Sequence, residues 1–281
     1  PLGGVQSILR RHLHRDPEVG ISPSALIVFE RGPFSEGAHE GQITGLGLRW
    51  YHSGRSLRKS LMTLDRAGIP RDAVWVYHDL WSLRTLADLD QARRRIGILH
   101  SHWTGAEEIL EGCDGLLDGI LGVSETIRRL GVQHVPALGA DRVQWIPYPV
   151  DIPRELPRRE WSPEERPCVI GYCGRIQRPQ KRVERLPEVA RHLAEAGVPQ
   201  RWEFLGEGRE QEWLSARFRE LGIEAVFHGV RRGARYWETF AGWDLILFAS
   251  DYEGLPIAML EAMSQGVVPV FPDLDNGGRD Y

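Results

Sequence analysis

The chain contains 281 residues, of which 42% are hydrophobic and 26% charged, and its formal net charge is -4. This composition excludes a disordered chain, which would combine low hydrophobicity with high net charge. No apolar run approaches the roughly 20 residues that span a bilayer, and neither half of the chain has the basic excess of a nucleic-acid-binding protein. The three cysteines, Cys113, Cys168 and Cys173, fit neither a disulfide framework nor a zinc motif, so we predict a cytoplasmic protein.

In the first half, short apolar runs alternate with amphipathic stretches, which predicts a parallel α/β domain at residues 1–150. Strands are expected at residues 25–29, 73–77, 96–99, 119–123 and 143–146. Helical patterns lie between them, for example at residues 57–67 and 83–95. The six prolines of residues 147–167 favour irregular structure, and we place a linker at residues 151–167.

The alternation resumes after the linker and predicts a second α/β domain at residues 168–281. Strands are expected at residues 169–173, 202–205, 225–228, 245–249 and 267–271. Helices are expected near residues 182–196, 209–221, 234–241 and 256–265, with a kink or a late start at Pro187. Together the two halves predict two Rossmann-like domains that face a cleft. Ligands of such sheets bind beyond the carboxyl ends of the strands.

Two glutamates, Glu253 and Glu261, flank the start of the expected helix at residues 256–265. Pro256 is well placed as the first helical residue. The amides of Gly254 and Leu255 form a potential anion site, since the first amides of a helix lack partners. In this interpretation Glu253 faces the cleft and Glu261 accepts hydrogen bonds from a diol. The alternative is that Glu253 interacts with the helix dipole and Glu261 is a solvated or capping carboxylate.

Two other loops follow expected strands. The first carries Arg175 and Lys181, one of only two lysines in the chain, and these cations suit a diphosphate. An exposed basic loop is the alternative. The second contains Gly206 and Gly208 but has Gln211 in place of the third glycine of a dinucleotide fingerprint. A tight turn explains both glycines, so we do not expect NAD binding.

Taken in order, these motifs resemble the donor domain of retaining family-4 (group 1) glycosyltransferases, which have the GT-B fold, and the resemblance covers residues 168–281. It implies that a nucleotide-diphosphate sugar binds here without a metal or other cofactor. The implied diphosphate-binding residues are Gly4, Arg175, Lys181, Gly254 and Leu255. The implied ribose- and nucleoside-binding residues are Glu261, Gly206, His228 and Val230. The implied catalytic residues, close to the transferred sugar, are Glu253 and His102.

The first half matches the same family less closely. Gly4 lies in a stretch that resembles the glycine loop, and residues 98–102 end an expected strand where the family carries a cleft histidine. We assign that role to His102, with His100 as the rival and a packed or capping histidine as the alternative. His78 and Asp79 end another expected strand and form a second candidate pair, in which Asp79 would face the acceptor. A helix N-cap is the expected role of Asp79.

The resemblance implies a retaining glycosyltransferase of glycan biosynthesis that moves a hexosyl group to a glycan, lipid or other hydroxyl acceptor. A nucleotide-sugar epimerase or phosphorylase, or a non-catalytic nucleotide-sugar-binding protein, remains the alternative. Acceptor specificity is expected in loops such as residues 30–56. The basic helix around Arg58 could contact the inner face of a membrane, but we expect these charges to form a solvated face. We also expect a chain truncated at both ends, without the first strand and the carboxyl-terminal helices of the family.

Overall fold

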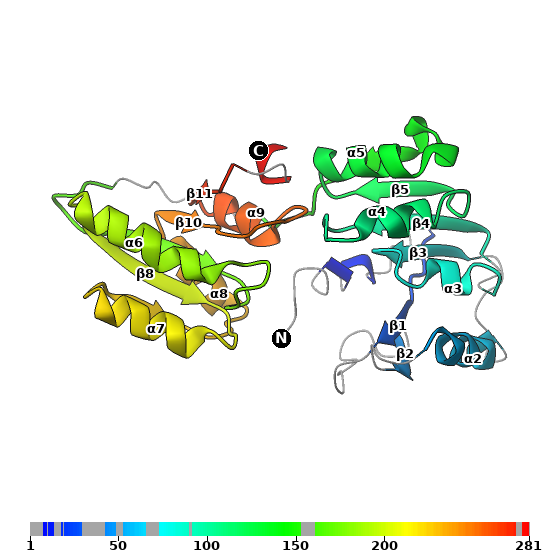
Figure 1. Cartoon of the computed structure of the whole chain (residues 1–281), viewed down its shortest axis with the longest axis horizontal. Coiled ribbons are helices and arrows are strands. Elements are labelled where there is room, and N and C mark those ends of the chain that lie inside the picture. The colour runs from blue at the N-terminus through cyan, green and yellow to red at the C-terminus, as the bar shows by residue number, and fades with distance from the viewer. Residues whose placement is uncertain are drawn as a thin grey trace. The chain divides into compact units, whose positions relative to one another are not determined.

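The computed structural model describes residues 8–9, 11–13, 18, 20–29, 43–48, 53–65, 73–89, 92–152, 161–273 and 277–280. The chain divides into two compact units, an amino-terminal unit, Leu2–Ile146, and a carboxyl-terminal unit, Pro147–Tyr281. Figure 1 labels the helices and strands of both units. Among the helices within the described ranges, none has the length and apolar composition of a membrane-spanning segment.

The carboxyl-terminal unit is built on a five-stranded parallel sheet. In spatial order its strands are β11 (Val268–Val270), β10 (Leu245–Leu247), β7 (Cys168–Cys173), β8 (Gln200–Leu205) and β9 (Ala225–Phe227). The helices between them are α6 (Leu186–Glu195), α7 (Gln211–Glu220), α8 (Ala234–Ala241) and α9 (Ile257–Ser264). Cys173 at the end of β7 lies opposite Leu205 at the end of β8, so the loops after both strands start at the same level.

Side chains alternate along the strands of this sheet, so its two faces contribute to two separate hydrophobic cores. Trp202 and Phe204 of β8 pack in one buried cluster with residues of α6 and α7, which lie alongside β8 in Figure 1. Gly171 of β7 points to the other face, since successive side chains of a strand alternate. A Cβ atom at Gly171 would lie 2.0 Å from the ring of Trp243, which is fully buried after α8. Helices therefore cover both faces, as the α/β prediction requires.

The amino-terminal unit contains a four-stranded parallel sheet and a separate parallel pair of strands. The larger sheet has the order β3 (Val74–His78), β4 (Arg94–Leu99), β5 (Gly119–Gly122) and β6 (Val143–Trp145). The pair consists of β1 (Ala25–Phe29) and β2 (Ile43–Leu48). The helices are α2 (Gly54–Asp65), α3 (Leu83–Leu86), α4 (Ala106–Glu111) and α5 (Glu125–His134). Ser124 caps α5 by accepting a hydrogen bond from the amide of Ile127.

Two expectations for the amino-terminal unit are wrong. Residues 30–56 are not loop throughout, because β2 and the start of α2 lie within them. The helix expected at residues 83–95 is only the single turn α3, and β4 already begins at Arg94. Asp118 explains the longer strand, since its carboxylate accepts hydrogen bonds from the Arg94 side chain and from the Arg95 amide. These partners are distant in sequence and invisible to a periodicity argument.

Two helix starts in the carboxyl-terminal unit bear on the predicted site. The late start expected near Pro187 is confirmed, because α6 begins at Leu186 and Pro187 takes its second position. Pro256 is not the first helical residue as expected. It is the N-cap of α9, with an extended ψ of 113°, and the helix begins at Ile257.

Candidate functional site

Loops from β7, β8, β9 and β10 meet at the carboxyl edge of the five-stranded sheet. Backbone hydrogen bonds join three of these loops in sequence: the Gly174 amide donates to Leu205 at 2.9 Å, and the Gly206 amide donates to Gly229 at 2.9 Å. This is the edge at which open parallel sheets bind ligands. The loops that carry Arg175, Gly206 and His228 are therefore one connected surface.

Glycines allow the first two loops to pack this closely. A Cβ atom at Gly206 would lie 2.0 Å from the carbonyl oxygen of Gly174, and one at Gly208 would lie 2.0 Å from that of Ile176. Gly206 also has a φ of +127°, a region that side chains disfavour. Close packing between the two loops accounts for both glycines.

Lys181 and Glu253, which are far apart in sequence, form an ion pair at this edge. The Lys181 Nζ atom lies 2.5 Å from Glu253 Oε1, and the same oxygen accepts the hydroxyl of Ser250 at 2.7 Å. Only 16% of the Lys181 side chain and 9% of the Glu253 side chain are exposed. Glu253 is thus held by a cation and a hydroxyl, beyond any interaction with the helix dipole.

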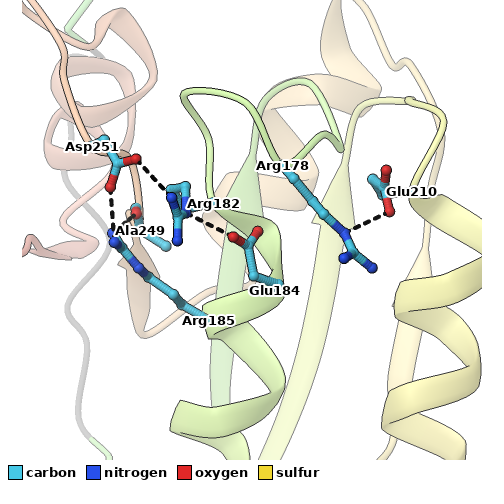
Figure 2. Close-up of polar contacts among 7 residues, drawn as sticks. All are labelled: Arg178, Arg182, Glu184, Arg185, Glu210, Ala249 and Asp251. Atoms are coloured by element: carbon cyan, nitrogen blue, oxygen red, sulfur yellow. Dashed lines mark hydrogen bonds and ion pairs between the residues drawn. The ribbon is translucent and has the colours of Figure 1, made fainter.

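The backbone on either side of Lys181 is strained. Gln180 and Arg182 have φ values of +68° and +48°, in the left-handed region that non-glycine residues rarely occupy. Asp251 compensates for this strain: its amide donates to the carbonyl of Gln180 at 2.8 Å, and its carboxylate lies 3.1 Å from Arg182 and 2.8 Å from Arg185. Figure 2 shows the contacts of the Asp251 carboxylate with both arginines.

Further contacts anchor the same loop at both ends. Arg185 donates to the carbonyl of Ala249 at 2.9 Å, and Glu184 lies 2.7 Å from Arg182. On the opposite side of the loop in Figure 2, Arg178 pairs with Glu210 at 2.9 Å. The loop after β7 is therefore tied to the start of α7 and to the loop after β10. The arginines position Lys181, a function that the sequence analysis did not assign to them.

Glu261 has a partly buried partner, Tyr236, that the sequence alone did not reveal. The Tyr236 hydroxyl of α8 donates to Glu261 Oε2 at 2.6 Å and lies 3.7 Å from the sulfur of Cys173. Burial raises the pKa of Tyr236 far above its ordinary value, and burial raises that of Cys173 to about 12. Both groups are therefore neutral donors at pH 7. Glu261, itself half-buried, therefore has a hydrogen-bonded partner within this unit.

The other predicted site residues of this unit differ in their exposure and contacts. Arg175 is exposed and donates to the side-chain oxygen of Gln180 at 2.8 Å. Leu255 is buried, and the Gly254 carbonyl accepts the Gly277 amide at 2.7 Å. Val230 is exposed at the end of the β9 loop.

The ring of His228 turns toward the sheet. Its Nε2 atom lies 2.9 Å from Glu203, which also accepts the indole N–H of Trp243 at 3.1 Å. The side chain of His228 thus has a structural partner within the sheet.

The two rival histidines of the amino-terminal unit occupy different surroundings. His100, directly after β4, is buried, and its ring stacks on that of His78 with centroids 5.0 Å apart and nitrogens 2.7 Å apart. His102 is half-exposed and pairs with Glu107 of α4 at 2.6 Å. His100 is therefore the packed histidine of this strand end. Gly4, the remaining predicted residue, lies outside the described residues.

Asp79 does not have the predicted N-cap role. Its Oδ1 atom accepts the His100 amide at 2.9 Å, whereas α3 begins after Ser82. The reason is the backbone of Asp79, whose φ of +56° turns the side chain back to the neighbouring strand end. Arg58, considered for a membrane-facing helix, forms a two-pronged contact with Asp88 at 2.6 and 2.8 Å.

Buried histidines make the amino-terminal unit sensitive to acid. Burial lowers the pKa of His100 to about 3 and that of His78 to about 4, so unfolding allows both to bind protons between pH 4 and their ordinary pKa near 6.5. Falling pH therefore favours the unfolded state. Burial raises the pKa of Asp79 to about 6, which opposes this trend, but with a smaller shift than the two histidines together.

We expect the free energy of unfolding to fall as the pH is lowered from 6.5 to 4, by about 1 kcal/mol or more. Urea titrations at several pH values measure this slope. The His100→Asn variant should flatten it, whereas His192→Asn, which replaces an exposed histidine of α6, should not. An unchanged slope in His100→Asn would contradict the assignment.

Residues 153–281 match the family described as group 1 glycosyl transferases. The chain is 33% identical over 132 residues to the lipopolysaccharide 1,6-galactosyltransferase of Salmonella typhimurium. This match covers 41% of the chain and 33% of that protein. The chain is also 37% identical over 103 residues to the sulfoquinovosyl transferase SQD2 of Arabidopsis thaliana. This second match covers 37% of the chain and 19% of that protein. The matches thus span a third or less of these relatives.

Solved structures extend the likeness to the fold. The apo form of the lipopolysaccharide outer core galactosyltransferase WaaB matches 99% of this chain and 79% of its own, with a TM-score of 0.74 and 20% identity. A mutant of S. aureus TarM, in complex with fondaparinux, alpha-GlcNAc-glycerol and UDP, matches 80% of this chain and 46% of its own, with a TM-score of 0.63 and 17% identity. The predicted α/β fold of the GT-B class is confirmed. The likeness to the group 1 glycosyl transferases is to their family model and covers residues 153–281.

Proposed function

We propose that the chain is part of a retaining glycosyltransferase that moves a hexosyl group from a nucleotide-diphosphate sugar to a hydroxyl group of a glycan or lipid. The observation that carries the proposal is the Lys181–Glu253 pair, which sets a cation and a carboxylate side by side at the ligand-binding edge of the sheet. Donor cleavage produces negative charge on the leaving diphosphate and positive charge at the anomeric carbon, and the pair offers one group for each.

Arg175, Lys181 and the backbone at Gly254 and Leu255 would bind the diphosphate. Preorganised cations and amides stabilise a developing anion most strongly when they need not move, and the Asp251 contacts keep the Lys181 loop in place. The diphosphate would compete with Glu253 for the Lys181 ammonium. In this proposal the chain's own cations stabilise the leaving diphosphate, without a metal cofactor. The UDP in the TarM structure makes a uridine nucleotide the first donor to test.

Glu261 would bind the ribose, with Tyr236 as its positioning residue. The Tyr236 hydroxyl fixes one carboxylate oxygen at 2.6 Å, so the orientation of Glu261 is set before the nucleotide arrives. His228 and Val230 would lie near the base. Glu253 and either His102 or His100 would act close to the transferred sugar, and we assign no covalent step to any of them.

Replacing Tyr236 with phenylalanine tests the ribose assignment. We expect the KM for the donor to rise about tenfold with little change in kcat, because the variant loses a hydrogen bond to a charged group. The same variant should not raise the KM for a 2′-deoxynucleotide sugar to that extent, since fewer ribose hydroxyls depend on Glu261. Equal losses with both donors would instead indicate general damage to the site.

The experiment that tests the proposed activity incubates the protein with UDP-, GDP- and ADP-sugars, with and without a panel of sugar and lipid acceptors. A glycosyltransferase releases the nucleotide diphosphate only when an acceptor is present, and the product keeps the anomeric configuration of the donor. Conversion of the donor alone would indicate an epimerase. Donor binding without any release would indicate a binding protein.

We also place the reaction in the cytoplasm or at the inner face of a membrane. The free thiols at Cys113, Cys168 and Cys173 support a reducing compartment.

A further inference from the structure

Two tryptophans form a stacked pair at the carboxyl edge of the sheet in the amino-terminal unit. Trp81 follows β3 and Trp103 follows β4, and their ring centroids are 5.3 Å apart with an interplanar angle of 20°. The side chain of Trp81 is 61% exposed, although tryptophan is usually well buried. β3 and β4 are adjacent and parallel, so the pair lies where such sheets bind ligands.

The turn that presents Trp81 is rigid and strained. Asp79 and Leu80 have φ values of +56° and +57°, each in the left-handed region and each unfavourable without glycine. Leu80 is buried so tightly that a Cβ atom at Gly97 would lie 2.8 Å from it. The Asp79 carboxylate holds the His100 amide on the neighbouring strand. Such strain persists only where the surrounding contacts enforce it. Here it leaves the indole of Trp81 exposed to solvent.

The segment around and after Trp103 is polar and acidic. His102, next to Trp103, pairs with Glu107, and both side chains are more than one-third exposed. Glu107 and Glu108 lie in the first turn of α4. Negative charge at this position disfavours an anionic membrane surface, which attracts basic segments. An uncharged ring with one apolar face and a rim of hydroxyl groups fits better, because aromatic faces can cover its C–H groups while Glu107 and His102 meet its hydroxyls.

We propose that Trp81 and Trp103 bind a pyranose ring of the acceptor, and that the acceptor of this enzyme is therefore a saccharide. Trp81 supplies the stacking surface, Trp103 supports it from behind, and the Glu107 carboxylate accepts a hydrogen bond from a ring hydroxyl. The inference rests on the proposed glycosyltransferase function and narrows its acceptor class.

The test is saturation-transfer difference NMR on the whole chain with four neutral probes: maltotriose, cellotriose, N,N′,N″-triacetylchitotriose and lactose. We expect at least one probe to bind, and Trp81→Ala to weaken its binding about tenfold or more, whereas Trp81→Phe weakens it less because a ring remains. Glu107→Gln is the second variant and should weaken binding about threefold or more. Trp161→Ala replaces an exposed tryptophan of the other unit and should bind the probes like the wild type.

The proposal is overturned if none of the four probes binds, or if Trp81→Ala and Glu107→Gln both bind like the wild type. It is also overturned if Trp81→Ala leaves probe binding unchanged and instead reduces sedimentation with phosphatidylglycerol-containing vesicles. Calorimetry with UDP on the same samples separates the two proposals. Binding of UDP without any saccharide overturns the acceptor site alone, whereas loss of both overturns the proposed function as well.

Discussion

The Lys181→Ala variant is expected to lower kcat/KM for the nucleotide-sugar donor by about 10²- to 10³-fold, the effect of removing one preorganised group that stabilises a developing anion. Lys181 is the partly buried cation of a fixed loop, and the strained backbone on both sides of it is held by Asp251. Arg175 cannot replace the lost ammonium, because it lies exposed on the same loop and already contacts Gln180.

The same variant has a structural cost that must be separated from the catalytic one. Removing the ammonium leaves the buried Glu253 carboxylate without a cation among the described residues, although Ser250 still donates to it. A buried charge that loses its partner destabilises a protein by about 3 kcal/mol. The double variant Lys181→Ala/Glu253→Gln removes that charge and should regain most of the stability without regaining activity. Full activity in either variant would contradict the role of Lys181. Lys59→Ala, at the other lysine of the chain, is the matched control.

Gly206→Ala is expected to lower the free energy of unfolding by about 2–3 kcal/mol, since the new methyl group must enter a closely packed loop. Its Cβ atom would lie 2.0 Å from the carbonyl oxygen of Gly174, and backbone atoms cannot rotate away as a flexible side chain can. The loop that carries Arg175 would be displaced, so donor affinity should fall together with stability. Chemical denaturation and donor titration of the same variant measure both effects.

Gly197→Ala provides the control for Gly206→Ala. Gly197 has a φ of +74°, but a Cβ atom there would meet nothing within 4 Å. This variant therefore reports the conformational cost of a left-handed residue, about 1 kcal/mol, without a steric clash. If the two variants are equally stable and bind the donor equally, the close approach of the loops after β7 and β8 does not shape the site.

Local sequence patterns were sufficient for the framework of the site. The apolar runs before Gly174, Gly206 and Ser250 are strands of one sheet, and the glutamates Glu253 and Glu261 lie on either side of the α9 start as expected. These features repeat at short range, so periodicity and turn residues reveal them.

What sequence reasoning missed is the set of partners from distant segments. Tyr236 approaches Glu261 from another helix, and Asp251 reaches Arg182 and Arg185 across 69 and 66 positions of the chain. Such contacts depend on the order of strands in the sheet, which no local pattern encodes. The glycine-containing β2 was missed for a related reason: its apolar signal is weak, and only its pairing with β1 makes it a strand.

Calorimetric titration of the wild type, Lys181→Ala and Lys59→Ala with UDP, GDP and ADP tests the central claim most directly. We predict that the wild type and Lys59→Ala bind one of these nucleotides with the same affinity, and that Lys181→Ala binds it at least about tenfold more weakly. The account is contradicted if the wild type binds none of the three, or if Lys181→Ala binds the nucleotide as tightly as the wild type does.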